Sequence, residues 1–153
     1  MNKGITTALL SIGLAQFLKI PIKMVKTGKW DWGVFFETGG MPSSHSAGVS
    51  SLATYIALKR GVSTIDFALS TIFGLIVMYD AQGVRRQTGE LSIRVNDLYE
   101  DIDRLEKQEK RAERHEQQEE KLKEVLGHQP EEVVGGALLG VATGALSYIL
   151  QKK

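Results

Sequence analysis

Four stretches of the chain are dominated by apolar residues and are nearly free of charge. They cover residues 4–18, 38–58, 61–79 and 133–150. A helix that crosses the hydrocarbon of a bilayer needs about 17–25 mostly apolar residues, and these stretches meet or approach that length, the first through an amphipathic continuation. A soluble bundle would carry charges on the outer face of each helix, which these stretches lack. The pattern predicts an all-α fold, a membrane-embedded bundle of about four helices that forms a single membrane domain over residues 1–153.

The segment 87–127 differs from the rest of the chain because it holds 12 of the 18 acidic residues and 8 of the 19 basic ones. Apolar residues recur inside it at intervals of three and four, as in a heptad seam: Val95, Leu98, Ile102 and Leu105. The pattern predicts a long charged helix, or a helical hairpin, inserted into the membrane domain and lying outside the bilayer. Two heptads are too few to specify a coiled-coil dimer, so we expect this helix to pack against its own protein. The alternatives are a homo-oligomer or a soluble partner bound through this helix.

Small residues repeat along the last apolar stretch. Gly136, Gly140 and Gly144 are four residues apart and therefore lie along one face of a helix. Such a face lets two membrane helices approach closely. Glycine is also generally frequent in membrane helices, so the repeat indicates either a close helix contact or no specific role.

Composition excludes several classes of protein. The chain has no cysteine, so it has neither disulfides nor thiolate metal ligands. Its net charge is +1, its basic residues are not interleaved with aromatic ones, and the charged segment is net acidic. These features argue against nucleic acid as a partner and leave the lipid bilayer as the expected one.

Four consecutive crossings of a bilayer would bring the polar ends of the apolar stretches to one membrane face. The ionisable residues and serines that gather there are Lys19, Ser43, Ser44, His45, Asp80, Arg85, Arg86, His128 and Glu132. Ionisable groups at membrane depth are costly and by default indicate a functional site. Interfacial anchoring explains nearby lysines such as Lys23 and Lys26, but it explains His45 poorly because His45 lies in an uncharged stretch.

These residue types suit the binding of an anion such as phosphate. Ser43 and Ser44 stand at a helix start, where free backbone amides and the helix dipole favour negative charge. Arg85 and Arg86 can each bind phosphate oxygens through two parallel hydrogen bonds, and Lys19 can add a point charge. The sequence therefore predicts a phosphate site built from these five residues.

Two histidines could supply the chemistry of such a site. His128 precedes Glu132 by four residues, so an imidazole and a carboxylate share one side of a helical turn. A carboxylate that holds one ring nitrogen leaves the other as an oriented nucleophile or base. His45 could then protonate a leaving alkoxide. Asp80 is interpreted first as a structural partner of the nearby arginines and only second as a site residue.

Three blocks of sequence resemble a known group of enzymes. They are Gly-Gly-Met-Pro-Ser-Ser-His-Ser at 39–46, Asp-Ala-Gln-Gly-Val-Arg-Arg at 80–86 and Gly-His-Gln-Pro-Glu-Glu-Val at 127–133. In this order they resemble the divergent branch of the type 2 phosphatidic acid phosphatase and vanadium haloperoxidase superfamily. The resemblance covers nearly the whole chain. It implies that His128 is a nucleophile forming a phosphohistidine, with Glu132 as its orienting carboxylate and His45 as the acid for the leaving group.

The signature of the wider superfamily has three blocks of its own: K-x6-R-P, P-S-G-H and S-R-x5-H-x3-D. The resemblance further implies that Arg85 or Arg86 clamps the phosphate and that Lys19 is the lysine of the first signature block. It also implies a metal-independent mechanism, so neither a metal nor a cofactor is expected. The chain departs from the superfamily in three ways. Lys19 is followed by Lys26 rather than by Arg-Pro, a glutamate replaces the third-block aspartate, and His128 lies 42 residues beyond Arg86. The charged segment fills that interval, and both of its ends return to the same membrane face.

The sequence as a whole predicts an integral membrane phosphatase that hydrolyses a lipid phosphate or diphosphate. The alternatives are a catalytically silent lipid-phosphate binding or transport protein and a membrane scaffold. Lysine and arginine are slightly more numerous on the site face, and the positive-inside tendency then places the site on the cytoplasmic side of the cell membrane.

Overall fold

The computed structural model describes residues 2–37, 39–108, 122 and 127–152. Every regular element in these ranges is helical, which confirms the all-α prediction. In chain order the elements are α1 (Lys3–Thr27), a short 3₁₀ helix η1 (Trp32–Phe36), α2 (Ser44–Arg60), α3 (Ile65–Gln82), α4 (Val84–Gln108) and α5 (Pro130–Gln151).

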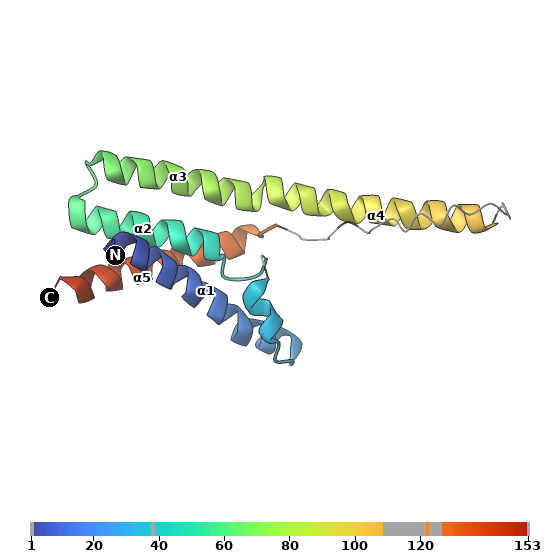
Figure 1. Ribbon diagram of the computed structural model, residues 1–153, viewed down its shortest axis with the longest axis horizontal. Helices are drawn as coiled ribbons and strands as arrows, with labels where there is room; N and C mark the ends of the chain where they lie inside the picture. Colours follow the sequence, from blue (N-terminus) through green and yellow to red (C-terminus); the bar gives the residue numbers. More distant parts are fainter. Residues whose placement is uncertain (1, 38, 109–121, 123–126, 153) are drawn as a thin grey trace.

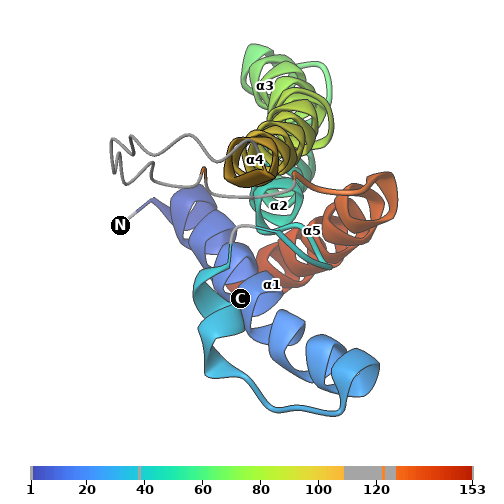
Figure 2. The ribbon, with the colours of Figure 1, turned by 90° about the vertical axis from the view of Figure 1, so that its right-hand side faces the viewer.

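Helix α2 is the centre of the bundle, and α1, α3 and α5 all pack against it (Figures 1 and 2). The starts of α2 and α5 and the end of α3 lie at one end of the bundle, and both chain termini lie at the other (Figure 1). Alternating crossings therefore bring the polar chain segments to one end, as the sequence predicts.

In the part of the chain that the structure describes, three helical stretches are long and apolar enough to cross a membrane: Lys3–Thr27, the α3–α4 stretch Ile65–Leu105, and Pro130–Gln151. The side chains of α3 point mainly outward, because only Gly74 and Ala81 are buried on it. Large apolar residues of α3 such as Phe73 are more than half exposed, as expected for a surface that contacts lipid. The prediction of a helical bundle with several membrane-spanning helices is thus confirmed.

The span predicted at residues 38–58 differs from the other three. Helix α2 has 17 residues and begins at Ser44 rather than at residue 38, and it falls outside the set of helices that could span a membrane by length and composition. Its small and polar residues are buried among its neighbours instead of facing lipid. Because its surroundings are protein, a helix with fewer apolar residues can occupy the centre of the bundle.

The glycine repeat of α5 is a close contact with α2. Gly136, Gly140 and Gly144 are buried, and a Cβ atom on each would meet a backbone carbonyl oxygen of α2. The carbonyls belong to Ser43, Ala47 and Ser51. Of the two interpretations of the repeat, the structure supports the close helix contact.

Side-chain hydrogen bonds also join the helices inside the bundle. The hydroxyls of Thr7 and Ser147 lie 2.6 Å apart, and those of Ser11 and Thr143 lie 2.8 Å apart. Ser11 also donates to the carbonyl oxygen of Ala47 at 3.1 Å. These bonds satisfy polar groups that lipid could not, and they fix the register of α1 against α2 and α5.

Helix α4 continues almost along the line of α3 and projects away from the bundle (Figure 1). It begins at Val84, three residues before the predicted charged segment, and α3 is the only described helix that it contacts. Among the described residues, α4 packs against no bundle helix other than α3, and its further contacts with its own protein are with the returning chain, at Leu122 and Gly127. The physical reason is that the chain passes Gly83 without reversing direction, so α4 leaves the bundle instead of folding back.

The chain returns from the charged segment beside α4. The side chain of Asn96 donates to the carbonyl oxygen of Leu122 at 2.9 Å and accepts from its N–H at 3.0 Å. The alternative prediction is a helical hairpin. Most of its second half would comprise residues 109–121 and 123–126, which lie outside the described residues.

Candidate active site

His128 is held in place from both sides just before α5 begins. Its backbone N–H donates to the carbonyl oxygen of Ala81 in α3 at 3.0 Å, and its side chain is only 3 % exposed. Its Nδ1 atom lies 2.9 Å from Oε2 of Glu132, in the first turn of α5. The carboxylate also accepts the N–H of Gln129 at 3.2 Å, so it is fixed as part of the helix start. The imidazole–carboxylate pair expected from the spacing is present.

The other ring nitrogen of His128 has no partner. Nε2 is buried and makes no hydrogen bond within the described residues. Because Nδ1 faces a carboxylate, the proton of a neutral ring belongs on Nδ1, and Nε2 carries the lone pair. A buried polar atom without a hydrogen bond costs about 1–3 kcal/mol, so this arrangement favours a ligand that Nε2 can contact.

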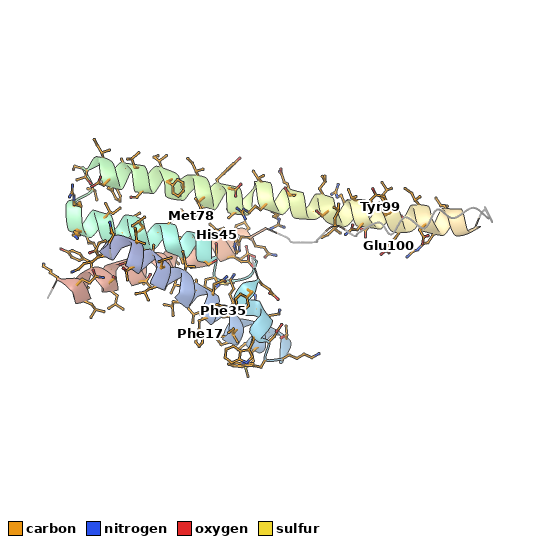
Figure 3. All side chains as sticks on the ribbon, viewed as in Figure 1. Phe17, Phe35, His45, Met78, Tyr99 and Glu100 are labelled. Carbon is orange, nitrogen blue, oxygen red and sulfur yellow. The ribbon has the colours of Figure 1, made fainter. Side chains whose placement is uncertain are left out.

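His45 faces His128 across the start of the bundle. It is the second residue of α2, and its ring centroid lies 5.9 Å from that of His128, with the ring planes at 70°. Its Nδ1 atom is also buried without a hydrogen bond in the part of the chain that the structure describes. Figure 3 shows His45 at the start of α2, at the same end of the bundle where α3 continues into α4. The two imidazoles therefore lie on two sides of one small region, His45 in the first turn of α2 and His128 directly before α5.

The start of α2 is tied to α5. The backbone N–H of Ser43 donates to the carbonyl oxygen of Glu132 at 2.9 Å, and its hydroxyl caps the helix by accepting from the backbone N–H of Ser46 at 3.3 Å. Ser43 and Ser44 are both buried. The Ser43 hydroxyl thus serves the helix cap. The amides of Ser44 and His45, in the first turn, have no acceptor within the helix and are the groups suited to an anion.

Lys19 is a buried cation directed at this region. Its residue is 2 % exposed, and Nζ donates to the carbonyl oxygen of Glu37 at 3.2 Å. Its charge interacts with the carboxylate of Glu132 and with the ring of His45. By contrast, Lys23 is partly exposed and pairs with the carboxylate of Glu37 at 2.8 Å. Lys19 therefore belongs to the site, whereas Lys23 ties α1 to the segment around η1.

The two neighbouring arginines point in different directions. Nε of Arg85 donates to the carboxylate of Asp80 at 2.7 Å, and the charges of both residues act on His45. Nε of Arg86 donates instead to Glu90, 3.1 Å away and one turn along α4. The expected pairing of Asp80 with an arginine is present. Of the two arginines, Arg85 is the one whose charge acts on His45.

Two contributions were not anticipated from the sequence. The backbone carbonyl of Glu37 holds Lys19, and such a contact leaves no signature in side-chain type. Gly127 packs directly on the backbone of Arg85 and Arg86, where any Cβ atom would collide. The sequence feature that could have indicated this close contact is the glycine directly before His128. It lets the returning chain lie against the start of α4 and so closes the site after the charged segment.

The assembled region contains two facing imidazoles, two cations and a carboxylate that orients one imidazole. No group of three histidine, aspartate or glutamate side chains with the arrangement of a metal site occurs among the residues that the structure describes. Chemically, cations and an imidazole of this kind can bind an anion and present a nitrogen lone pair to it.

Comparison with known proteins identifies the family of the chain. The family model described as "Divergent PAP2 family" matches residues 1–143. The chain is 45 % identical over 143 residues to the uncharacterized membrane protein YuiD of Bacillus subtilis (strain 168), an alignment that covers 92 % of this chain and 90 % of YuiD. No solved structure matches the chain. From its family match and its relative, the chain belongs to the divergent PAP2 family and is a membrane protein.

Proposed function

We propose that this protein is an integral membrane phosphatase that hydrolyses a lipid phosphate or diphosphate through a phosphohistidine intermediate. The observation that carries the proposal is the buried, unpartnered Nε2 of His128, whose ring is held at Nδ1 by Glu132 and faces His45. A histidine prepared in this way is a nucleophile with a fixed direction of attack.

In the first step, Nε2 of His128 attacks phosphorus and the bond from phosphorus to the lipid oxygen breaks. His45, entering the step protonated, gives its proton to the leaving oxygen. In the second step, water attacks the phosphorus, His45 takes the proton of that water, and the phosphorus–nitrogen bond breaks. Inorganic phosphate leaves, and both histidines return to their starting states.

The remaining groups would stabilise the charge on the transferring phosphoryl group. Lys19 and Arg85 supply positive charge, and the amides of Ser44 and His45 supply donors at the positive end of α2. The Ser43 hydroxyl acts in this scheme by holding the helix start in place. The proposed mechanism uses no metal and no cofactor.

The position of the site favours a lipid substrate. Its groups lie at the end of a bundle whose outer surface is apolar, where a lipid headgroup would meet the membrane surface. A phosphate held there would leave its acyl or polyprenyl chains beside the spanning helices. The substrate class is therefore a lipid phosphate or diphosphate, such as phosphatidate, phosphatidylglycerophosphate or a polyprenyl diphosphate.

The experiment is phosphate release by purified protein in detergent across a panel of these lipids, with wild type compared to His128→Ala. We expect release by wild type and none by the variant, with both proteins eluting as the same species. Retention of a lipid phosphate by wild type without release would favour the alternative of a silent binding or transport protein. Full activity of His128→Ala would rule out the proposed nucleophile.

We further propose that the protein resides in the cell membrane with its site and α4 on the cytoplasmic side, as the distribution of lysine and arginine favours. Because the chain has no cysteine, a single Asp97→Cys variant reports the side directly. A membrane-impermeant thiol reagent should label it only after permeabilisation of the cells. Labelling in intact cells would place α4 outside.

A further inference from the structure

An apolar seam runs along the projecting helix α4, and most of its described side chains are exposed. Its residues are Thr88, Leu91, Val95, Leu98, Ile102 and Leu105, which follow one another at alternating intervals of three and four. Leu91, Leu98 and Leu105 are each 60–63 % exposed. Because α4 already begins at Val84, the seam covers about three heptads rather than two, which is enough to pair with another helix.

The protein's own described parts leave the seam free. Helix α3 is the only described helix that contacts α4, and it does so where the two helices join. The described returning chain contacts α4 at Asn96, which directly follows Val95 and lies about 100° further around the helix, and at the start of α4, where Gly127 packs on Arg86. Figure 3 shows Tyr99 on the projecting helix, far from the bundle around His45.

We propose that a second copy of this chain covers the seam, through a parallel two-stranded coiled coil between the α4 helices of two protomers. The seam composition argues for this occupant. In the heptad register, the β-branched residues Thr88, Val95 and Ile102 occupy the a positions, and three leucines occupy the d positions. Among parallel coiled coils, β-branched valine or isoleucine at a with leucine at d is the combination that favours two strands over three or four.

The membrane supports the same geometry. The span of α3 continues directly into α4, so two copies inserted in one bilayer with the same orientation project their α4 helices to the same side. Helices that leave one membrane face in this way run parallel. The residues outside the seam are mostly charged or polar, as expected for a two-stranded coil surrounded by water.

The absence of cysteine from the chain allows a direct test of the pairing. Leu91→Cys and Leu105→Cys each place a thiol in the seam, near its two ends. Asp97→Cys is the matched control, because Asp97 is exposed on the same helix away from the seam. The full-length variants are oxidised in membranes and examined by non-reducing electrophoresis. We expect both seam variants to form a dimer of twice the monomer mass, and the control to stay largely monomeric.

A second variant separates pairing from folding. Leu98→Asp added to Leu91→Cys should abolish the cross-link while leaving the melting temperature of the membrane bundle unchanged, because Leu98 contacts none of the bundle helices. Equal cross-linking of the control and the seam variants would overturn the proposal. Cross-linking of Leu91→Cys to Ile102→Cys on co-expression, without either homodimer, would indicate antiparallel pairing and would overturn it as well. These outcomes do not depend on whether the protein is a phosphatase.

Discussion

Oε2 of Glu132 lies 2.9 Å from Nδ1 of His128 and also accepts the backbone N–H at the start of α5. One carboxylate oxygen therefore fixes both the orientation of an imidazole and the position of the helix that carries it. The opposite ring nitrogen is left buried and free of hydrogen bonds among the described residues. This relationship is the basis of the proposed nucleophile, and its energetic role can be measured.

Glu132→Gln should lower kcat on the order of 10²-fold or more, because the amide neither fixes the tautomer of His128 nor stabilises the charged ring. Glu131→Gln is the matched control. Glu131 is exposed in the same helical turn, and its loss should change kcat little. Both are measured as phosphate release at saturating substrate. A similar loss in the two variants would indicate that Glu132 acts only on the stability of the helix start.

His45→Gln should slow the hydrolysis of alkyl phosphates by about 10²–10⁴-fold, the usual contribution of a positioned acid. The loss should be much smaller for an aryl phosphate with an acidic leaving group, since that oxygen leaves without a proton. The measurement is kcat/KM for the two substrate types in parallel. An equal loss for both would contradict the role of His45 as the acid for the leaving group.

Arg85→Ala should reduce kcat/KM by roughly 10²–10³-fold, because a cation that faces the transferring phosphoryl group is lost. Arg86→Ala removes the same side chain one residue later, where the structure pairs it with Glu90 on the surface of α4. It should retain nearly full activity. A larger loss for Arg86→Ala than for Arg85→Ala would reverse the assignment of the clamp.

Gly140→Ala should destabilise the bundle by about 1–3 kcal/mol, because the added methyl group would press on the backbone of α2 at Ala47. Gly13→Ala is the control, since nothing lies within 4 Å of its Cβ position and alanine is the better helix former. Thermal unfolding in one detergent compares the two. A melting temperature of Gly140→Ala at or above wild type would show that the α2–α5 contact is looser than described.

Much of the site could be predicted from the sequence because it depends on two simple regularities. Helical spacing places Glu132 beside His128, and alternating crossings bring His45 to the same end of the bundle. The structure confirms both relationships. The chemical roles of these residues stay predictions.

Other features could not be predicted because they depend on contacts that residue type does not encode. Arg85 and Arg86 are adjacent, and residue type does not show that Arg85 pairs with Asp80 while Arg86 pairs with Glu90. The hydrogen bond from Lys19 to the backbone carbonyl of Glu37 is likewise not encoded by residue type, because every residue has a backbone carbonyl. The heptad pattern identified an apolar face on α4 but did not indicate that α4 projects away from the bundle.

The most direct test of the central claim is to trap the phosphoenzyme. Purified protein is mixed with a ³²P-labelled lipid phosphate, quenched within milliseconds and digested, and the labelled peptide is sequenced. The account predicts an acid-labile, base-stable phosphoryl group on His128 that forms and decays at rates compatible with turnover and is absent from His128→Ala. Turnover by wild type with no label on His128 under any quench condition would contradict it.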